Sequence, residues 1–459
     1  MDNKPLSARD VAVMALRDRS GNVSDRLVKL FDRAKLSRQD RALARELVMG
    51  VIRRRGTLDA ILKAFLLHPG RKLPAPLTEV LQVAIYQLAF LQGIPDFAAV
   101  DQAVQQALRM GHRRRSGLVN GVLRSVARCL GEVVQGPAPM SADVLVLSET
   151  SYKVMNRPIF ADPASEPVEY LAGAHSLPLE LARRWLACRG NVDAVVNMAI
   201  HANTTPPMVF RVNRLRATVD HAVESVAAQG LNVSPHVNGM SIVIQGRLDL
   251  AELNAFNEGW LQVQDPTASD VSIAAACRPG QKVLDLCAAP GTKTTHMAEL
   301  MENRGSIVAV DVSQEKTSCI EDNCRRMGIT TVETLPAAQV TSLSKGSFDL
   351  ALVDAPCSNT GVLARRPEAR WRFHHQKLPK VVALQKQLVV EAARFVRQGG
   401  RLVYSTCSIE EEECGDMGRE IPRLVPTLKL IEERLTLPRG AGDPTEWRDG
   451  GYYALFQVV

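Results

Sequence analysis

The first 132 residues carry apolar side chains at the spacing of amphipathic helices. Ser7 and Ser37 precede two of these segments and are suited to cap a helix N-terminus. The segment 75–91 is almost wholly apolar, which predicts a central, buried helix. The segments with helical spacing are residues 8–19, 37–65, 75–91, 97–111 and 116–130. Because no strand-like alternation interrupts them, residues 1–132 are predicted to form one all-helical domain.

The pattern loses this regularity between residues 133 and 258. Five prolines break any long helix in residues 133–175, which we interpret as a linker with loose local structure. Residues 176–258 mix two helical segments with short strands, so a small α+β module is expected there. The helical segments are residues 177–190 and 217–231, and the strands lie within residues 204–215 and 239–246.

From residue 259 onward the chain repeats strand, turn and helix. The strand segments are residues 281–288, 305–313, 347–356 and 400–408, and the helical segments are residues 292–303, 314–328 and 380–397. Two further strand-like segments follow, residues 427–431 and 451–459. Alternating strands and helices predict a doubly wound, mostly parallel sheet, so residues 259–459 are expected to form a Rossmann-like α/β domain.

Composition narrows the class of protein without naming its activity. A chain of 459 residues with 46% apolar and 23% charged residues is expected to form two or three globular, soluble domains. No apolar run is long enough to span a membrane, and the first residues lack the apolar core of a secretory signal. The nine cysteines form no CxxC pair, which indicates free thiols in a reducing cytoplasm and no metal site.

Charge is distributed unevenly along the chain. Residues 1–130 hold 23 Lys/Arg and 11 Asp/Glu, a net charge of +12, whereas the remaining 329 residues hold 33 and 38, a net charge of −5. Such asymmetry points to a polyanion-binding module joined to a second function. The alternative is a solvated basic surface with no partner. We favour nucleic-acid binding by the helical domain and by the adjoining α+β module.

Polar residues of unusual type fall at the ends of the predicted parallel strands, where doubly wound sheets bind their ligands. They are Asp285, Cys287, Asp311, Asp354, Cys357 and Cys407. The first turn has a single glycine, Gly291, before a helix N-terminus, which suits a small anion such as an amino-acid carboxylate better than a pyrophosphate. Asp311 stands where an acid commonly binds ribose hydroxyls. A carboxylate anchor and a ribose anchor together describe S-adenosylmethionine.

Two motifs that each carry a cysteine suggest the chemistry. Residues 353–372 place Asp354 and Cys357 on a turn after a strand, and a basic stretch with one aromatic residue follows. This stretch could hold an RNA backbone and stack a base, or it could be an ordinary surface loop. Its residues are Arg365, Arg366, Arg370, Trp371 and Arg372. Cys407 follows the next strand just before a predicted helix start, which favours its thiolate. Glutamates 410–413 are expected only to favour that helix start.

Paired thiols beside a methyl-donor site point to methylation of cytosine at C5. That carbon is a poor nucleophile until a thiolate adds to C6 and makes C5 enamine-like. The C5 proton and the thiol must leave afterwards. Asp354 is placed to hydrogen-bond the ring, either as a proton donor or as an acceptor from the exocyclic amine.

The motifs DLCAAPGTKT, DAPCSNTGVLARRPEARW and YSTCSIEEEE resemble those of the Nop/Sun family of RNA cytosine-5 methyltransferases. The helical first third resembles the NusB RNA-binding domain, a combination similar to the Sun/RsmB type that acts on 16S ribosomal RNA. The resemblance implies a class I methyltransferase fold, Cys407 as nucleophile and Cys357 in product release. It further implies a cofactor site for S-adenosylmethionine, formed by Cys287, Ala288, Ala289, Pro290, Gly291, Thr292, Lys293, Asp311 and Asp354. Expected partners are 16S rRNA and no DNA, membrane or metal, with the protein a monomer in the cytoplasm.

One departure from the family pattern concerns the turn after the third strand. The family usually has an acidic residue there on the adenine side, whereas Ala337 and Ala338 occupy the expected turn and Gln339 follows. A charge-assisted hydrogen bond contributes about 1.5–3 kcal/mol, so the sequence predicts weaker cofactor binding or a substitute contact from Gln339.

Three other functions fit the same residues less well. A tRNA substrate would keep the chemistry but leave the NusB-like domain unexplained. A non-catalytic RNA-binding or antitermination-type factor would have no need of both cysteines, Asp354 and Asp311. A DNA cytosine methyltransferase would carry its nucleophile in the Pro-Cys motif and would not need Cys407.

Overall fold

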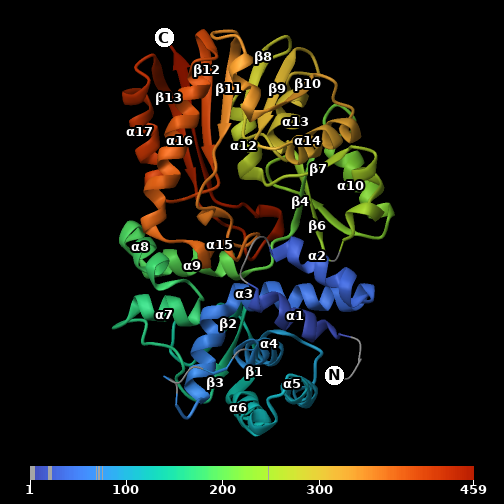
Figure 1. The fold of residues 1–459 in the computed structure, drawn as a ribbon, viewed down its shortest axis with the longest axis vertical. Helices are drawn as coiled ribbons and strands as arrows, with labels where there is room; N and C mark the ends of the chain where they lie inside the picture. Colours follow the sequence, from blue (N-terminus) through green and yellow to red (C-terminus); the bar gives the residue numbers. More distant parts are fainter. Residues whose placement is uncertain (1–5, 19–22, 69, 71–72, 75, 247) are drawn as a thin grey trace. The chain divides into compact units, whose positions relative to one another are not determined.

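The computed structural model describes residues 6–18, 23–68, 70, 73–74, 76–246 and 248–459, which fold as two compact units (Figure 1). The first unit runs to Thr204 and also contains the short segment Arg370–Arg372. The second unit contains Thr205–Ala369 and Phe373–Val459. Among the described residues, no helix is both long enough and apolar enough to cross a membrane.

The first unit begins with the expected helical bundle. Its helices are α1 (Ala8–Arg17), α2 (Val23–Ala34), α3 (Arg38–Phe65), α4 (Leu77–Phe90), α5 (Asp96–Arg109) and α6 (Ser116–Cys129), with the 3₁₀ turn η1 (Arg113–Arg115). Ser7 and Ser37 cap α1 and α3 as predicted, each accepting a hydrogen bond from the backbone N–H three residues on. The apolar helix α4 is buried on nearly every side and packs against α1, α3, α5 and α6, so its predicted central place is confirmed.

The segment predicted to be a loose linker is instead part of the folded first unit. Its strands β1 (Leu130–Gln135), β2 (Val144–Ser148) and β3 (Ser151–Met155) form an antiparallel sheet in the order β1-β3-β2, and α7 (Pro167–Ala174) follows. Arg54 of α3 donates hydrogen bonds to the carbonyls of Val146 and Leu147, at 3.0 and 2.7 Å. The prediction was wrong because the prolines lie in the connections between these elements or at the first turn of α7, where proline disturbs nothing.

Two more helices complete the first unit, α8 (Leu179–Arg189) and α9 (Val192–Asn203). The expected α+β module therefore divides after Thr204: its first helical segment packs in the first unit, and its strands belong to the second. The strands β4 (Met208–Val212), β5 (Asn232–Pro235), β6 (Ser241–Gln245) and β7 (Leu261–Val263) form an antiparallel sheet in the order β5-β6-β4-β7. Helices α10 (Val219–Ala228) and α11 (Asn254–Asn257) and the 3₁₀ turn η2 (Leu250–Glu252) accompany it.

The larger sheet of the second unit is doubly wound, as predicted. Its strands are β8 (Lys282–Leu286), β9 (Ser306–Asp311), β10 (Val332–Pro336), β11 (Phe348–Asp354), β12 (Val396–Thr406), β13 (Leu428–Thr436) and β14 (Gly451–Val458). They lie in the order β10-β9-β8-β11-β12-β14-β13, and only β14 runs against its neighbours. The chain order reverses between β8 and β11, which makes their carboxyl ends the natural place for a ligand.

Helices cover both faces of this sheet (Figure 1). On one face α12 (Pro266–Ala274), α13 (Thr292–Leu300) and α14 (Gln314–Met327) pack on one set of alternating strand residues. On the other face α16 (Leu378–Ala393) and α17 (Gly415–Leu424) pack on the opposite set. Short elements connect them: α15 (Ala369–Arg372), η3 (Ala337–Ser342), η4 (Thr360–Val362), η5 (His375–Lys377), η6 (Glu411–Glu413) and η7 (Pro444–Glu446). The strands, buried on both faces, hold the strand-end loops in fixed positions.

Candidate active site

The polar residues singled out in the sequence do lie at the carboxyl ends of neighbouring strands. Asp285 is in β8, and Asp311 and Asp354 are the last residues of β9 and β11. Cys407 directly follows β12, which is paired with β11 so that Asp354 lies opposite Ser405. Parallel pairing therefore brings together four chain segments that are far apart in the sequence.

The turn after β8 depends on a glycine and is hydrogen-bonded to the end of β9. Gly291 has a φ of +91°, and a Cβ there would lie 3.0 Å from Cγ2 of Ile320, so the tight entry into α13 requires glycine. The backbone N–H of Ala289 donates to Oδ2 of the buried Asp311 at 3.0 Å. The first N–H groups of α13 are thus presented at the switch point of the sheet.

Burial raises the pKa of two groups at this strand end. Desolvation, with a contribution from the nearby carboxylate of Asp354, raises the pKa of Asp285 to about 7. Its Oδ2 accepts from Thr294 Oγ1 at 2.6 Å, while Oδ1 has no hydrogen-bond partner among the described residues. Burial and the charge of Asp311 raise the pKa of Cys287 to about 12, so this thiol is a weak nucleophile.

Lys293 and Asp354 form an ion pair at the centre of the site. The Nζ–Oδ2 distance is 2.7 Å, and Ser405 Oγ donates to the other oxygen, Oδ1, also at 2.7 Å. Burial works against the lysine charge, but Asp354 and Cys407 outweigh it and hold the pKa of Lys293 above its ordinary value. Asp354 is therefore an acceptor on both oxygens within the protein.

The two cysteines meet, with Sγ atoms of Cys357 and Cys407 only 3.1 Å apart. The hydrogen bond between them, burial and the charge of Glu413 raise the pKa of Cys357. The same hydrogen bond lowers the pKa of Cys407 against the effect of burial, and Arg366 and Lys293 add to the lowering. Cys407 is thus the thiol that ionises first.

The expected cause of the lowered pKa of Cys407 was wrong. Helix α17 begins only at Gly415, so Cys407 is not at a helix N-terminus. Arg366 acts through its charge. Its guanidinium also donates to Asn359 Oδ1 at 2.9 Å, and the same oxygen accepts from Cys407 Sγ at 3.3 Å. The hydrogen bond with Cys357, together with the positive charges of Arg366 and Lys293, favours the thiolate in place of a helix dipole.

The loop after β11 approaches Cys407 through backbone contacts that only glycine permits. The N–H of Gly361 donates to the carbonyl of Cys407 at 3.0 Å, and its own carbonyl accepts from Gly450 at 2.8 Å. A Cβ on Gly361 would lie 2.5 Å from the Gly450 oxygen. A pocket opens between these loops, lined among others by Asp265, Lys293, Asp354, Cys407 and Tyr452.

The sequence predicted that a basic stretch of five residues binds RNA. For three of them this prediction is corrected, because their side chains bond within the protein. Arg365 is paired with two buried carboxylates, Asp449 at 2.5 Å and Asp265 at 3.3 Å. Arg370 is fully buried in the first unit, and the indole N–H of Trp371 donates to the Ile52 carbonyl at 2.7 Å. These groups already have internal partners. Arg366 and Arg372 are exposed.

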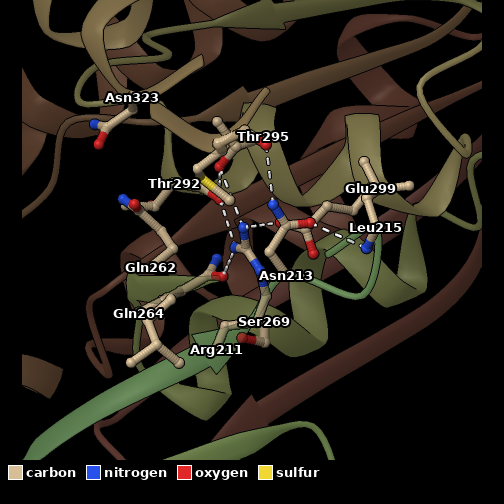
Figure 2. A network of polar contacts seen from close by, with 12 residues as sticks. Arg211, Asn213, Leu215, Gln262, Gln264, Ser269, Thr292, Thr295, Glu299 and Asn323 are labelled. Atoms are coloured by element: carbon tan, nitrogen blue, oxygen red, sulfur yellow. Dashed lines mark hydrogen bonds and ion pairs between the residues drawn. The ribbon is translucent and has the colours of Figure 1, made fainter. Parts of the chain in front are cut away.

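A second buried arginine, which the sequence did not single out, supports the start of α13. Figure 2 shows Arg211 of β4 reaching the first turns of that helix. Its guanidinium donates to the Thr292 carbonyl at 2.9 Å and pairs with Glu299 at 2.5 Å, both groups being buried. The smaller sheet thereby fixes the helix that carries Lys293.

The turn after β10 has the composition expected from the sequence. Ala337 and Ala338 begin the 3₁₀ turn η3, and Gln339 follows with its side chain exposed. No carboxylate stands there. Glu333, the acid nearest in sequence, is exposed within β10.

Comparisons with known proteins agree with this site and fold. Residues 272–441 match the family model described as 16S rRNA methyltransferase RsmB/F, and residues 6–128 match the NusB family. The chain is 32% identical over 442 residues to a probable ribosomal RNA small subunit methyltransferase B of Bacillus subtilis, covering 94% of this chain and 92% of that one. It is 30% identical over 382 residues to ribosomal RNA small subunit methyltransferase B of Escherichia coli O127:H6, covering 83% and 81%.

Solved structures share the fold. A structure of PH0851 superposes with a TM-score of 0.75 at 24% identity and covers 99% of both chains. NSun6 from Pyrococcus horikoshii, solved with SFG, gives a TM-score of 0.55 at 21% identity and covers 63% of this chain and all of that one. With its NusB domain, its doubly wound sheet and its relatives over most of its length, this chain belongs to the RsmB/F family of 16S rRNA methyltransferases.

Proposed function

We propose that this chain transfers a methyl group from S-adenosylmethionine to C5 of a cytidine in 16S ribosomal RNA through a covalent bond between Cys407 and C6. The pair of thiols carries the proposal: two Sγ atoms 3.1 Å apart at the ends of adjacent strands, beside the Lys293–Asp354 ion pair. One thiol can add to the ring while the second remains protonated. The names of the relatives support ribosomal RNA as the substrate.

The turn after β8 fits the cofactor. Backbone N–H groups at the start of α13 suit the carboxylate of its methionine part, and the unpartnered Oδ1 of the buried Asp285 suits its ammonium group. Asp311 would hold the ribose hydroxyls, with Ala288 to Lys293 forming the wall of the site. The bound cofactor supplies a methyl group on a sulfonium. Exposed Gln339 is the side chain available on the adenine side.

The residues of the chain then have distinct tasks in the reaction. The Cys407 thiolate forms a bond to C6, and the electron pair of the C5–C6 double bond moves to C5, which takes the methyl group. Lys293 stabilises negative charge on the ring, and Asp354 accepts a hydrogen bond from the exocyclic amine, since both its oxygens already act as acceptors. Transfer of the C5 proton to a water molecule then re-forms the C5–C6 double bond and expels Cys407 as its thiolate, a release in which Cys357 assists.

Three single variants test this proposal. Cys407→Ala is expected to abolish methyl transfer, because the neighbouring thiol of Cys357 has a raised pKa and stays protonated. Cys357→Ala is expected to retain adduct formation but to accumulate protein covalently attached to RNA, seen as a slow band on a denaturing gel. Cys319→Ala, which changes an exposed thiol on α14, is the matched control and is expected to turn over normally.

The identity of the RNA is tested on the same material. Bisulfite sequencing of 16S rRNA should show one cytidine that resists conversion in cells with the gene. The same cytidine should be converted in cells without it. Normal turnover by Cys407→Ala would refute the mechanism. A change confined to tRNA would keep the mechanism and replace the substrate, and no change in either RNA would favour a non-catalytic RNA-binding role.

A further inference from the structure

Glu413 is a fully buried carboxylate between the two cysteine loops. It ends the 3₁₀ turn Glu411–Glu413, and its exposed fraction is 0%, whereas Glu411 on the same turn is exposed. An acid taken out of water in this way needs several hydrogen-bond donors. The run of four glutamates therefore contains two buried residues, Glu410 and Glu413, and Glu413 is the one that bonds to both cysteine loops.

The donors to Glu413 come from the residues that directly follow the two cysteines. Its Oε1 accepts from the backbone N–H of Ser358 at 2.9 Å. Its Oε2 accepts from Ser408 Oγ at 2.6 Å and from the hydroxyl of Ser358. Ser358 follows Cys357, and Ser408 follows Cys407. One carboxylate thus bonds both loops and fixes their separation.

The carboxylate is itself held in place from two other elements. Gln385 of α16 donates to Glu413 Oε1 at 3.0 Å and to the carbonyl of Pro356 at 2.9 Å. The hydroxyl of Tyr404 in β12 lies 2.8 Å from the backbone carbonyl of Glu413. Gln385 and Tyr404 are both buried. A network in which each member is bonded resists rearrangement and keeps its geometry.

The charges around the two thiols differ in sign. Glu413 places a negative charge on the side of Cys357, which disfavours a thiolate there. Cys407 faces Lys293 and Arg366, which favour its thiolate, and Asp354, which opposes them. Without Glu413 the pKa values of the two thiols would differ less.

We propose that Glu413 is a positioning residue that fixes the two cysteine loops against each other and makes Cys357 keep the proton while Cys407 acts as the nucleophile. The inference deepens the proposed function and rests on it for the identity of the nucleophile. Among the described residues, the Glu413 side chain hydrogen-bonds to Ser358, Ser408 and Gln385, not to either cysteine. It acts through Ser358 and Ser408 and through its charge.

The first test compares Glu413→Gln with Glu411→Gln, the exposed glutamate of the same turn. Iodoacetamide alkylation of the free full-length protein, followed by peptide mass spectrometry, gives the rate at each cysteine across a range of pH. In Glu413→Gln the rate at Cys357 relative to Cys407 is expected to rise about tenfold near neutral pH, equivalent to a change of about one pKa unit. Glu411→Gln is expected to keep the wild-type ratio.

The second test separates position from charge. Ser408→Ala removes the 2.6 Å hydrogen bond but keeps the carboxylate, so Cys357 should remain slow to alkylate. Its kcat for methyl transfer is expected to fall about tenfold with KM unchanged, because a shift of a reacting group by a fraction of an ångström slows chemistry without weakening RNA binding. This variant also serves if Glu413→Gln fails to fold.

Two results would overturn the proposal. An unchanged alkylation ratio in folded Glu413→Gln would exclude the electrostatic role, and a wild-type kcat in Ser408→Ala would exclude the positioning role. Alkylation requires neither RNA nor cofactor. A shifted ratio in a protein that methylates no RNA would therefore support the role of Glu413 and reject the proposed function, so the two failures are distinguishable.

Discussion

Two arginine-rich segments of the molecule have opposite surroundings. Arg113 and Arg114, in the 3₁₀ turn before α6, are exposed to solvent. Arg365 and Arg370, in the stretch after β11, are turned inward and bonded. Both segments look alike in the sequence, since each places several arginines within a few positions. The density of positive charge therefore did not reveal which segment is available to an RNA phosphate.

What separates the two segments is the set of acceptors that each finds in the fold. Arg365 meets Asp265 and Asp449, which are 100 and 84 residues away in the sequence. Among the described residues, Arg370 donates to carbonyl-type oxygens of Arg53, Ser176, Ala202 and Asn203. A guanidinium can donate five hydrogen bonds in fixed directions, so it serves as an internal clamp as readily as a phosphate ligand.

The largest effect is expected from Arg370→Met. This change leaves four buried oxygens without their donor, and each unsatisfied acceptor lowers stability by about 1–3 kcal/mol. We expect a total loss of about 3–5 kcal/mol from the first unit, visible as a melting temperature lower by roughly 10 °C. Arg124→Met, on the exposed side of α6, is the control and should change the melting temperature little. Equal stability of the two variants would show that Arg370 is not a clamp.

A smaller and pH-dependent effect is expected from Arg365→Met. Burial and the neighbouring Asp449 raise the pKa of Asp265 to about 6, and Arg365 counteracts them. A carboxyl whose pKa is raised on folding destabilises the folded state above that pKa, and the penalty fades as protonation sets in at lower pH. Removing Arg365 raises the pKa further, so the loss should reach about 3 kcal/mol near pH 8 and shrink towards pH 5.

Differential scanning calorimetry across that pH range checks this sign. The control is Arg397→Met, which breaks an exposed pair with Asp349 and should lower stability by less than about 1 kcal/mol. Asp349 has a lowered pKa, caused by hydrogen bonds from Lys282 and Arg397 that outweigh its partial burial, and it stays charged throughout the range. A loss in Arg365→Met that grew towards acid pH would contradict the assigned ion pairs.

Much of the fold could be predicted because local periodicity determines it. The parallel strands and their helices each carry a regular pattern over five or more residues, and the strand ends followed from that pattern. The linker was mistaken because proline excludes a helix interior but says little about short strands between prolines. The division after Thr204 could not be predicted, since it depends on which unit α8 and α9 pack against.

The residues of the candidate site that could be predicted are those that stand in short sequence motifs. Asp354, Cys357 and Cys407 stand in motifs whose chemistry is legible in a few consecutive residues. Glu413 was missed because its role depends on a hydrogen bond with Ser358, which is 55 residues away in the sequence. Together with the three neighbouring glutamates, it resembles a solvated run of acidic residues. Arg365 was misread for the same reason, because its buried acids are distant in the sequence.

The smallest effect in this series concerns the exposed segment itself. Replacing Arg113, Arg114 and Arg115 together by Gln should leave the melting temperature unchanged but weaken binding of a 16S rRNA fragment about tenfold at low salt. Each phosphate contact contributes about 0.7 to 0.9 to the slope of log affinity against log salt, so the slope should fall by about 2. Fluorescence anisotropy titrations at several salt concentrations measure both quantities. An unchanged slope would mean that exposure, like charge density, does not identify an RNA-binding arginine. The positive charge of the helical bundle would then act through other residues.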